Sequence, residues 1–122
     1  MTLHVISEEF SVCKLKDYSQ IDPSHPFTFT GATDEEYSLV CPTSVVPSNT
    51  TERSDGWRAF RIEGTLDFSL IGILSKISAV LAENRIGIFA ISTFNTDYIL
   101  TKTENFVRAI QALKAAEYEI IQ

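Results

Sequence analysis

The chain has 122 residues, a hydrophobic fraction of 44%, a charged fraction of 21% and a net charge of −6 at pH 7. These values exclude a long disordered chain and a collagen-like chain, and they argue against nucleic-acid binding, because an acidic surface repels phosphate backbones. No apolar run is long enough to cross a membrane, and no basic leader precedes an apolar segment. Two cysteines make no disulfide framework, although a single bridge between them stays open, and they form neither a CxxC pair nor a His/Cys cluster. The sequence therefore predicts a cytoplasmic protein with reduced thiols, without metal or cofactor.

The N-terminal half holds all four prolines and both cysteines, and it contains no long amphipathic helix. Apolar–polar alternation or enrichment in strand-forming residues predicts strands at residues 3–6, 10–15, 27–30 and 37–41. The turn-rich segment 31–36 joins two of them as a hairpin, and residues 43–46 form a single helical turn. The sequence therefore predicts a small, mostly β module.

A polar, turn-rich stretch without apolar periodicity, residues 47–56, follows this half. Such a composition is typical of a linker or a long loop. We therefore divide the chain into a module of residues 1–54 and a module of residues 55–122.

The second module begins with an alternating strand at residues 57–62, followed by apolar residues at helical spacing from 70 to 81. Ser69 is the expected N-cap of this helix, and Asn84 or Gly87 its end. The continuous apolar run 86–91 then predicts a buried strand.

A turn at residues 95–97 and a return strand at 98–101 come next. Thr103 is the expected cap of a second helix, with Glu104 in the first turn, where the helix dipole favours a negative charge. The buried side of this helix is predicted to consist of Phe106, Ile110 and Leu113, and the last strand to cover residues 119–121. The order β-α-β-β-α-β, with both helices on one sheet face, predicts a ferredoxin-like α+β sandwich.

Catalytic motifs are missing from the sequence. It contains neither a P-loop nor a GxGxxG pattern, and its two histidines stand outside any nucleophile–base arrangement. The loop at residues 64–69 carries a carboxylate where an acylphosphatase needs a cation. The sequence therefore predicts a protein that is not an enzyme.

Two segments offer complementary charges instead. Residues 66–74 run from a strand into a helix N-terminus, whose free N–H groups suit a carboxylate. Gly72 there either opens the backbone to a close neighbour or allows tight helix–sheet packing, and both interpretations stay open. In residues 91–100, Asp97 either holds an ammonium group or makes an Asx turn, which the spacing alone favours. Because a free amino acid carries both charges, the two segments together point to an amino-acid ligand.

Three runs also carry a family resemblance: residues 56–59, 66–74 and 88–100. Through them, residues 56–118 closely resemble an ACT domain, of the small bacterial group whose modules are similar to those of the eukaryotic cytosolic arginine sensor. Residues 10–15 and 37–42 resemble the same group, which places a reduced ACT-like module in this position.

The resemblance implies a βαββαβ fold and a regulatory protein, a homodimer or higher homo-oligomer, that binds a small amino acid between ACT modules. Carried over by motif, the ligand-binding residues are Leu70, Ile71, Gly72, Ile73, Leu74, Ser92, Thr93, Phe94 and Asp97. The sequence departs from the arginine sensor at Leu70, where the sensor's loop is acidic, so the identity of the amino acid stays open. The alternative function is a ligand-free module for protein–protein interaction or oligomerisation.

Overall fold

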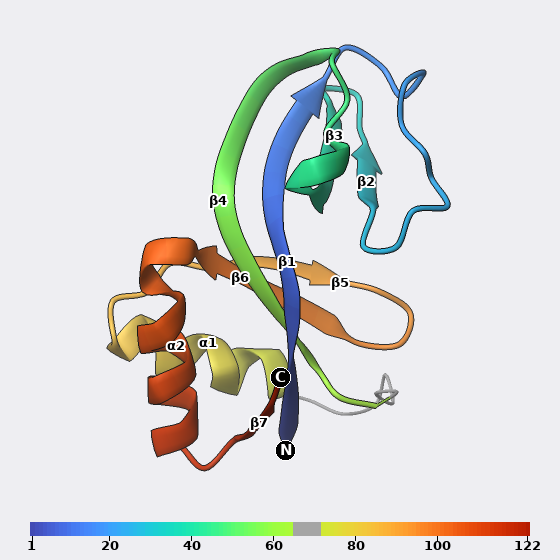
Figure 1. Ribbon diagram of the computed structural model, residues 1–122. Helices are drawn as coiled ribbons and strands as arrows, with labels where there is room; N and C mark the ends of the chain where they lie inside the picture. Colours follow the sequence, from blue (N-terminus) through green and yellow to red (C-terminus); the bar gives the residue numbers. More distant parts are fainter. Residues whose placement is uncertain (65–71) are drawn as a thin grey trace. The chain divides into compact units, whose positions relative to one another are not determined.

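The computed structural model describes residues 1–64 and 72–122 (Figure 1). It contains two compact units, one made of Met1–Ser7 with Arg58–Gln122 and the other of Glu8–Trp57. Strands β1 (Thr2–Leu15) and β4 (Thr50–Ile62) run through both units. The compact units thus differ from the division after residue 54, because the first seven residues group with the C-terminal half.

In the larger unit, β4 is followed by the predicted order of helices and strands: α1 (Ile73–Glu83), β5 (Phe89–Ser92), β6 (Asp97–Lys102), α2 (Thr103–Ala115) and β7 (Glu119–Ile121). Within this unit the strand order is β7-β1-β4-β6-β5. β5 and β6 pair antiparallel, whereas β7 pairs parallel with β1. The βαββαβ segment alone does not complete this sheet, because β1 lies between its first and last strands.

Both helices of the larger unit lie on the same side of its strands (Figure 1). They bury one apolar face against alternate residues of β1, β4 and β6, as the pleat of a strand requires. The buried residues of this core are Leu3, Val5, Phe60, Ile62, Ile77, Leu81, Ile86, Ile99, Phe106, Ala109, Ile110 and Leu113.

The smaller unit contains β2 (Phe29–Ala32), β3 (Tyr37–Pro42) and the 3-10 turn η1 (Thr43–Val45), close to the positions that the sequence predicts. β3 pairs antiparallel with β1 and with β2. Its register places Cys41 opposite Ser11 and Cys13 opposite Leu39, so the two buried thiols are diagonal neighbours and both are free. Diagonal positions are about 7–8 Å apart, too far for a disulfide without backbone movement.

The predicted loop at residues 47–56 is wrong for most of its length, because β4 already begins at Thr50. This part of β4 leaves its side chains exposed or half-buried, so it has no apolar periodicity from which a strand could be recognised. Its position beside β1 is supported by the Lys16 N–H, which donates to the Asn49 carbonyl at 3.1 Å, and by the Thr51 hydroxyl, which donates to the Lys14 carbonyl at 3.1 Å.

The buried strand predicted at residues 86–91 is also wrong in part. β5 covers Phe89–Ser92, and its side chains alternate between half-buried and exposed. The reason is its place at the end of the strand order, where one long side of β5 has no neighbouring strand among the residues that the structure describes.

The helix boundaries differ from the sequence predictions at their N-termini. α1 has Gly72 as its N-cap, and α2 has Lys102, with Thr103 as its first residue; neither N-cap side chain makes a capping hydrogen bond. The proposed cap Ser69 lies outside the described residues. The prediction of Asn84 as the end of α1 is confirmed, as is that of the buried side of α2.

Candidate functional site

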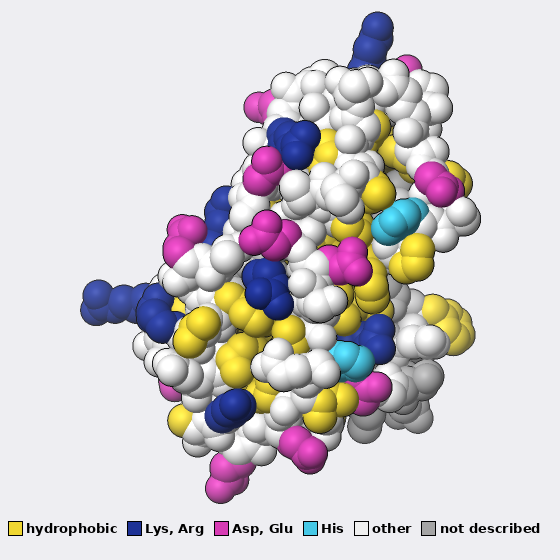
Figure 2. Space-filling view, in the orientation of Figure 1, with side chains coloured by type: hydrophobic (Ala, Val, Ile, Leu, Met, Phe, Trp, Pro, Cys, Tyr) yellow, Lys and Arg dark blue, Asp and Glu magenta, His cyan; other side chains and the backbone are white. Residues whose placement is uncertain are grey.

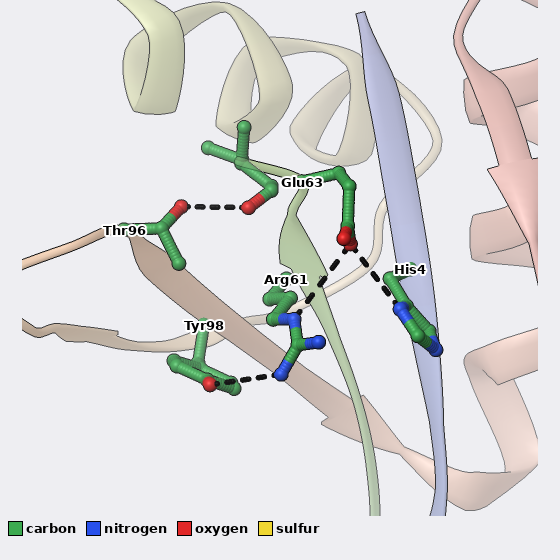
Figure 3. Close-up of polar contacts among 6 residues, drawn as sticks. His4, Arg61, Glu63, Thr96 and Tyr98 are labelled. Atoms are coloured by element: carbon green, nitrogen blue, oxygen red, sulfur yellow. Dashed lines mark hydrogen bonds and ion pairs between the residues drawn. The ribbon is translucent and has the colours of Figure 1, made fainter. Parts of the chain in front are cut away.

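The turn between β5 and β6 is attached to the last residue of β4. The buried side chain of Thr96 donates a hydrogen bond from Oγ1 to the Ile62 carbonyl at 2.8 Å (Figure 3). The turn itself is closed by the Thr93 N–H, which donates to the Thr96 carbonyl at 2.9 Å. This arrangement brings the segment 92–97 next to the point where the connection from β4 to α1 begins.

Asp97 lies directly across the hairpin from Ser92, and the Ser92 hydroxyl donates to Asp97 Oδ1 at 2.6 Å. The carboxylate therefore takes part in a cross-strand contact, not in the Asx turn that the spacing favoured. Its second oxygen accepts no hydrogen bond from the residues that the structure describes. Phe94, at the tip of the hairpin, is 77% exposed.

The start of α1 presents backbone groups. Gly72 has φ of 83° and no side-chain cap, so the N–H groups of the first turn have no partner within the helix. Ile73 and Leu74 are half-buried and pack against the core of the larger unit, so their side chains stabilise the fold. Leu70 and Ile71 lie outside the described residues.

The structure excludes one of the two interpretations of Gly72. No described atom lies within 4 Å of a Cβ built on it, which excludes tight helix–sheet packing there as the reason for glycine. The positive φ is the reason, because this backbone conformation is costly for residues with a Cβ.

A hollow of about 350 Å³ opens beside the first turn of α1. Its lining consists of Met1, Ile73, Lys76, Ala116, Glu117 and Tyr118. Of the predicted ligand-binding residues, Ile73 lines this hollow, and those of the hairpin do not.

A polar network that the sequence analysis missed lies at the end of β4 (Figure 3). Arg61 donates from Nη1 to the Tyr98 hydroxyl at 3.3 Å, and its Nε is 3.7 Å from Glu63 Oε2. The same carboxylate oxygen is 3.2 Å from His4 Nδ1. Alternation in residues 57–62 does identify the face of Arg61, but the neighbours on that face come from β1 and β6, which local sequence does not indicate.

This network and Asp97 project from opposite faces of the strands. Ile62 and Ile99 belong to the helix-covered core, so Arg61 and Tyr98 point to the other face, whereas Asp97 shares the face of Ile99. One small ligand held by Asp97 is therefore not held by Arg61 of the same chain.

Charges of both signs lie on the face of the molecule that Figure 2 shows. On the face shown in Figure 2, Lys and Arg side chains are interspersed with Asp and Glu side chains, so this view presents no continuous basic surface. Among the described residues, no group of three or more His, Cys, Asp or Glu side chains is placed to hold a metal ion. No helix in the described part of the chain is long and apolar enough to cross a membrane.

A family comparison decides the assignment of the fold. The ACT domain family matches residues 52–115, more than half of the chain. The chain belongs to the ACT domain family. ACT domains are regulatory modules. The matched segment contains all of α1, β5, β6 and α2, and most of β4.

Solved structures show the same fold over nearly the whole ACT-domain chain. A protein from Agobacterium tumefaciens matches with a TM-score of 0.84 and 26% identity, covering 98% of this chain and 91% of that one. A protein of unknown function from Vibrio cholerae, described as a possible transport protein, matches with a TM-score of 0.70 and 17% identity, covering 92% and 86%.

The aspartate kinase of Clostridium acetobutylicum, described as an allosteric enzyme, matches with a TM-score of 0.65 and 13% identity, covering 89% of this chain and 32% of that chain. At such low identities, the Vibrio and Clostridium structures show a shared fold alone. A comparison with curated protein sequences gave no significant match.

Proposed function

We propose that this ACT-domain protein is a non-catalytic regulatory protein of the cytoplasm that binds a small amino acid at an interface between ACT modules. The observation that carries the proposal is the Asp97 carboxylate, which Ser92 orients at 2.6 Å beside a hairpin turn attached to β4. The allosteric aspartate kinase with the same fold supports a regulatory role.

Each part of the proposed site has a chemical task. Asp97 accepts hydrogen bonds from the ligand's ammonium group through Oδ2, while Ser92 holds Oδ1. The backbone N–H groups at Gly72–Leu74 bind the carboxylate, since a helix N-terminus favours an anion. Thr93 and the exposed ring of Phe94 cover the ligand side chain. The family resemblance adds Leu70 and Ile71, which lie outside the described residues. A second copy of the chain supplies the facing module.

A thermal-shift screen against the twenty amino acids at millimolar concentration tests this function. A ligand at 100 times its dissociation constant stabilises a folded protein by about 2.7 kcal/mol, which is a rise in Tm of several degrees for a domain of this size. We expect one amino acid, or a few related ones, to raise Tm. A flat screen would contradict amino-acid binding.

Substitution of Asp97 locates the site. Asp97→Asn keeps an oxygen for the Ser92 hydroxyl and removes the charge, so we expect the fold to persist and the ligand-induced shift to disappear; Asp97→Ala should do the same. Asp34→Asn, at an exposed turn of the smaller unit, is the control and should retain the full shift. An undiminished shift in Asp97→Asn would remove this residue from the site.

Ligand-free association is the second candidate function, favoured by the edge position of β5. An edge strand leaves a row of backbone N–H and C=O groups that can pair with another chain. Light scattering distinguishes the candidates, because a dimer that persists unchanged with every amino acid favours association alone. A monomer at every concentration would count against it.

A further inference from the structure

The smaller unit contains a cavity of about 110 Å³ that the proposed function does not use. It lies between the loop that follows β1 and the buried strand β3, and its walls include Asp22, His25, Thr28 and Cys41. The volume corresponds to about three or four water molecules, or to a molecule of a few heavy atoms.

The hydroxyl group of Thr28, in the wall of this cavity, lacks a hydrogen-bond partner among the described residues. The Thr28 Oγ1 atom is buried and makes no hydrogen bond with any residue that the structure describes. A buried hydroxyl without a partner is costly, so it is normally satisfied by water or a ligand.

The side chains of Gln20, Asp22 and His25 also line the cavity. Gln20 Oε1 accepts from the Ser48 hydroxyl at 2.7 Å, and its amide nitrogen is a donor. His25 Nδ1 is 2.9 Å from the Pro26 carbonyl; because a carbonyl only accepts, Nδ1 donates this hydrogen bond. Asp22 Oδ1 accepts from the Ser24 N–H at 3.0 Å and from its hydroxyl at 2.6 Å. These hydrogen bonds lower the pKa of Asp22, so its carboxylate is ionised at neutral pH.

The rest of the wall is largely apolar. Burial raises the pKa of Cys41 to about 11, so this thiol stays neutral. Ile21 and Leu39 supply apolar surface, and the described lining contains no Lys or Arg. The cavity is therefore small and partly apolar, with the carboxylate of the exposed residue Asp22 in its wall.

We propose that this cavity binds a short-chain primary amine as its ammonium ion, with the N–H groups directed at Asp22 and Thr28 and the alkyl stem against Ile21 and Leu39. An ammonium group has three donors and no acceptor, which matches the Asp22 carboxylate and the unpartnered Thr28 hydroxyl. The site lies in the smaller unit and is independent of the proposed amino-acid site in the larger one.

Methyl and amide NMR titrations of the full chain with propylammonium test the proposal. We expect saturable shifts confined to Ile21, Leu39, Val45 and Thr28. The neutral isostere 1-propanol should bind several-fold more weakly, and propionate should produce no saturable shift. Propylammonium that causes no saturable shift in the folded protein would show that the cavity holds water only, which would overturn the proposal.

Two aspartates in the same unit provide a matched pair of variants. Asp17 makes the same contacts with Ser19, at 3.0 and 2.6 Å, that Asp22 makes with Ser24, but it does not line the cavity. Asp22→Asn should weaken propylammonium binding about fivefold, the limit for a solvent-exposed ion pair, whereas Asp17→Asn should leave it unchanged. Equal binding of 1-propanol, or undiminished binding by Asp22→Asn, would refute an ammonium site.

Discussion

Gly72 shows how one backbone angle determines a residue type. Gly72 has φ of 83° and is the residue immediately before α1. No described atom lies within 4 Å of the position that its Cβ would occupy. The cost of a side chain at this position is therefore conformational, not steric. Since the same residue belongs to the proposed ligand site, its conformation also sets the direction of the backbone N–H groups in the first turn.

Replacement of Gly72 by alanine should lower the free energy of unfolding by about 1–2 kcal/mol, the cost of a left-handed conformation for an L-residue. Gly72→Asn should cost less, because asparagine tolerates this conformation. Urea denaturation measures both. Gly87→Ala is the matched control: Gly87 also has open space around its Cβ but no positive φ, so its substitution should be nearly neutral. A similar loss in both alanine variants would contradict the conformational explanation.

Among the helices and strands, α2 illustrates how an amphipathic helix is held by one face. Phe106 is 7% exposed in the core of the larger unit, and the guanidinium of Arg58 lies 4.7 Å from the centre of its ring. The next residue, Val107, is 67% exposed. Adjacent positions on one helix thus have opposite environments, as the 3.6-residue period requires.

Phe106→Ala should destabilise the protein by about 3–5 kcal/mol, because it removes a buried ring and leaves a cavity. Val107→Ala, one position along α2, should change stability by less than about 0.5 kcal/mol. Chemical denaturation followed by circular dichroism gives both values. Comparable effects of the two substitutions would mean that the face of α2 toward the strands has been assigned incorrectly.

For the whole molecule, β1 is the strand that makes the larger unit discontinuous in sequence. Leu3 and Val5 belong to the same buried core as residues of β4, β6 and both helices. The Glu63 N–H donates to the Thr2 carbonyl at 2.9 Å, and the Glu119 N–H to the Met1 carbonyl at 3.1 Å. The C-terminal βαββαβ segment therefore depends on residues that are more than fifty positions away in the chain.

Leu3→Ala should accordingly lower the free energy of unfolding by about 2–5 kcal/mol, as for a core leucine. Ser7→Ala, an exposed position on the same strand, should be close to neutral. Urea denaturation gives the values, and hydrogen exchange at α1 and α2 reports whether the loss reaches the helices. A stability unchanged by Leu3→Ala would show that β1 contributes nothing to the core of the larger unit.

The local pattern of the sequence was sufficient to predict the helices, the hairpin strand β6, the 3-10 turn and the last strand. These depend on the spacing of apolar residues within about fifteen positions, such as Phe106, Ile110 and Leu113 on α2. The resemblance to an ACT domain also rests on short runs of neighbouring residues, and the match of the ACT domain family to residues 52–115 confirms that family.

Tertiary structure alone decided which strands are neighbours. Nothing in the segment 2–15 indicates that it pairs with β7 and β3, and the polar residues of β4 carry no period at all. The network of His4, Arg61, Glu63 and Tyr98 depends on that pairing, as does the diagonal placement of the two thiols. The physical reason is that a strand's hydrogen bonds are made with partners distant in sequence, and a local pattern defines the faces of a strand but not its neighbours.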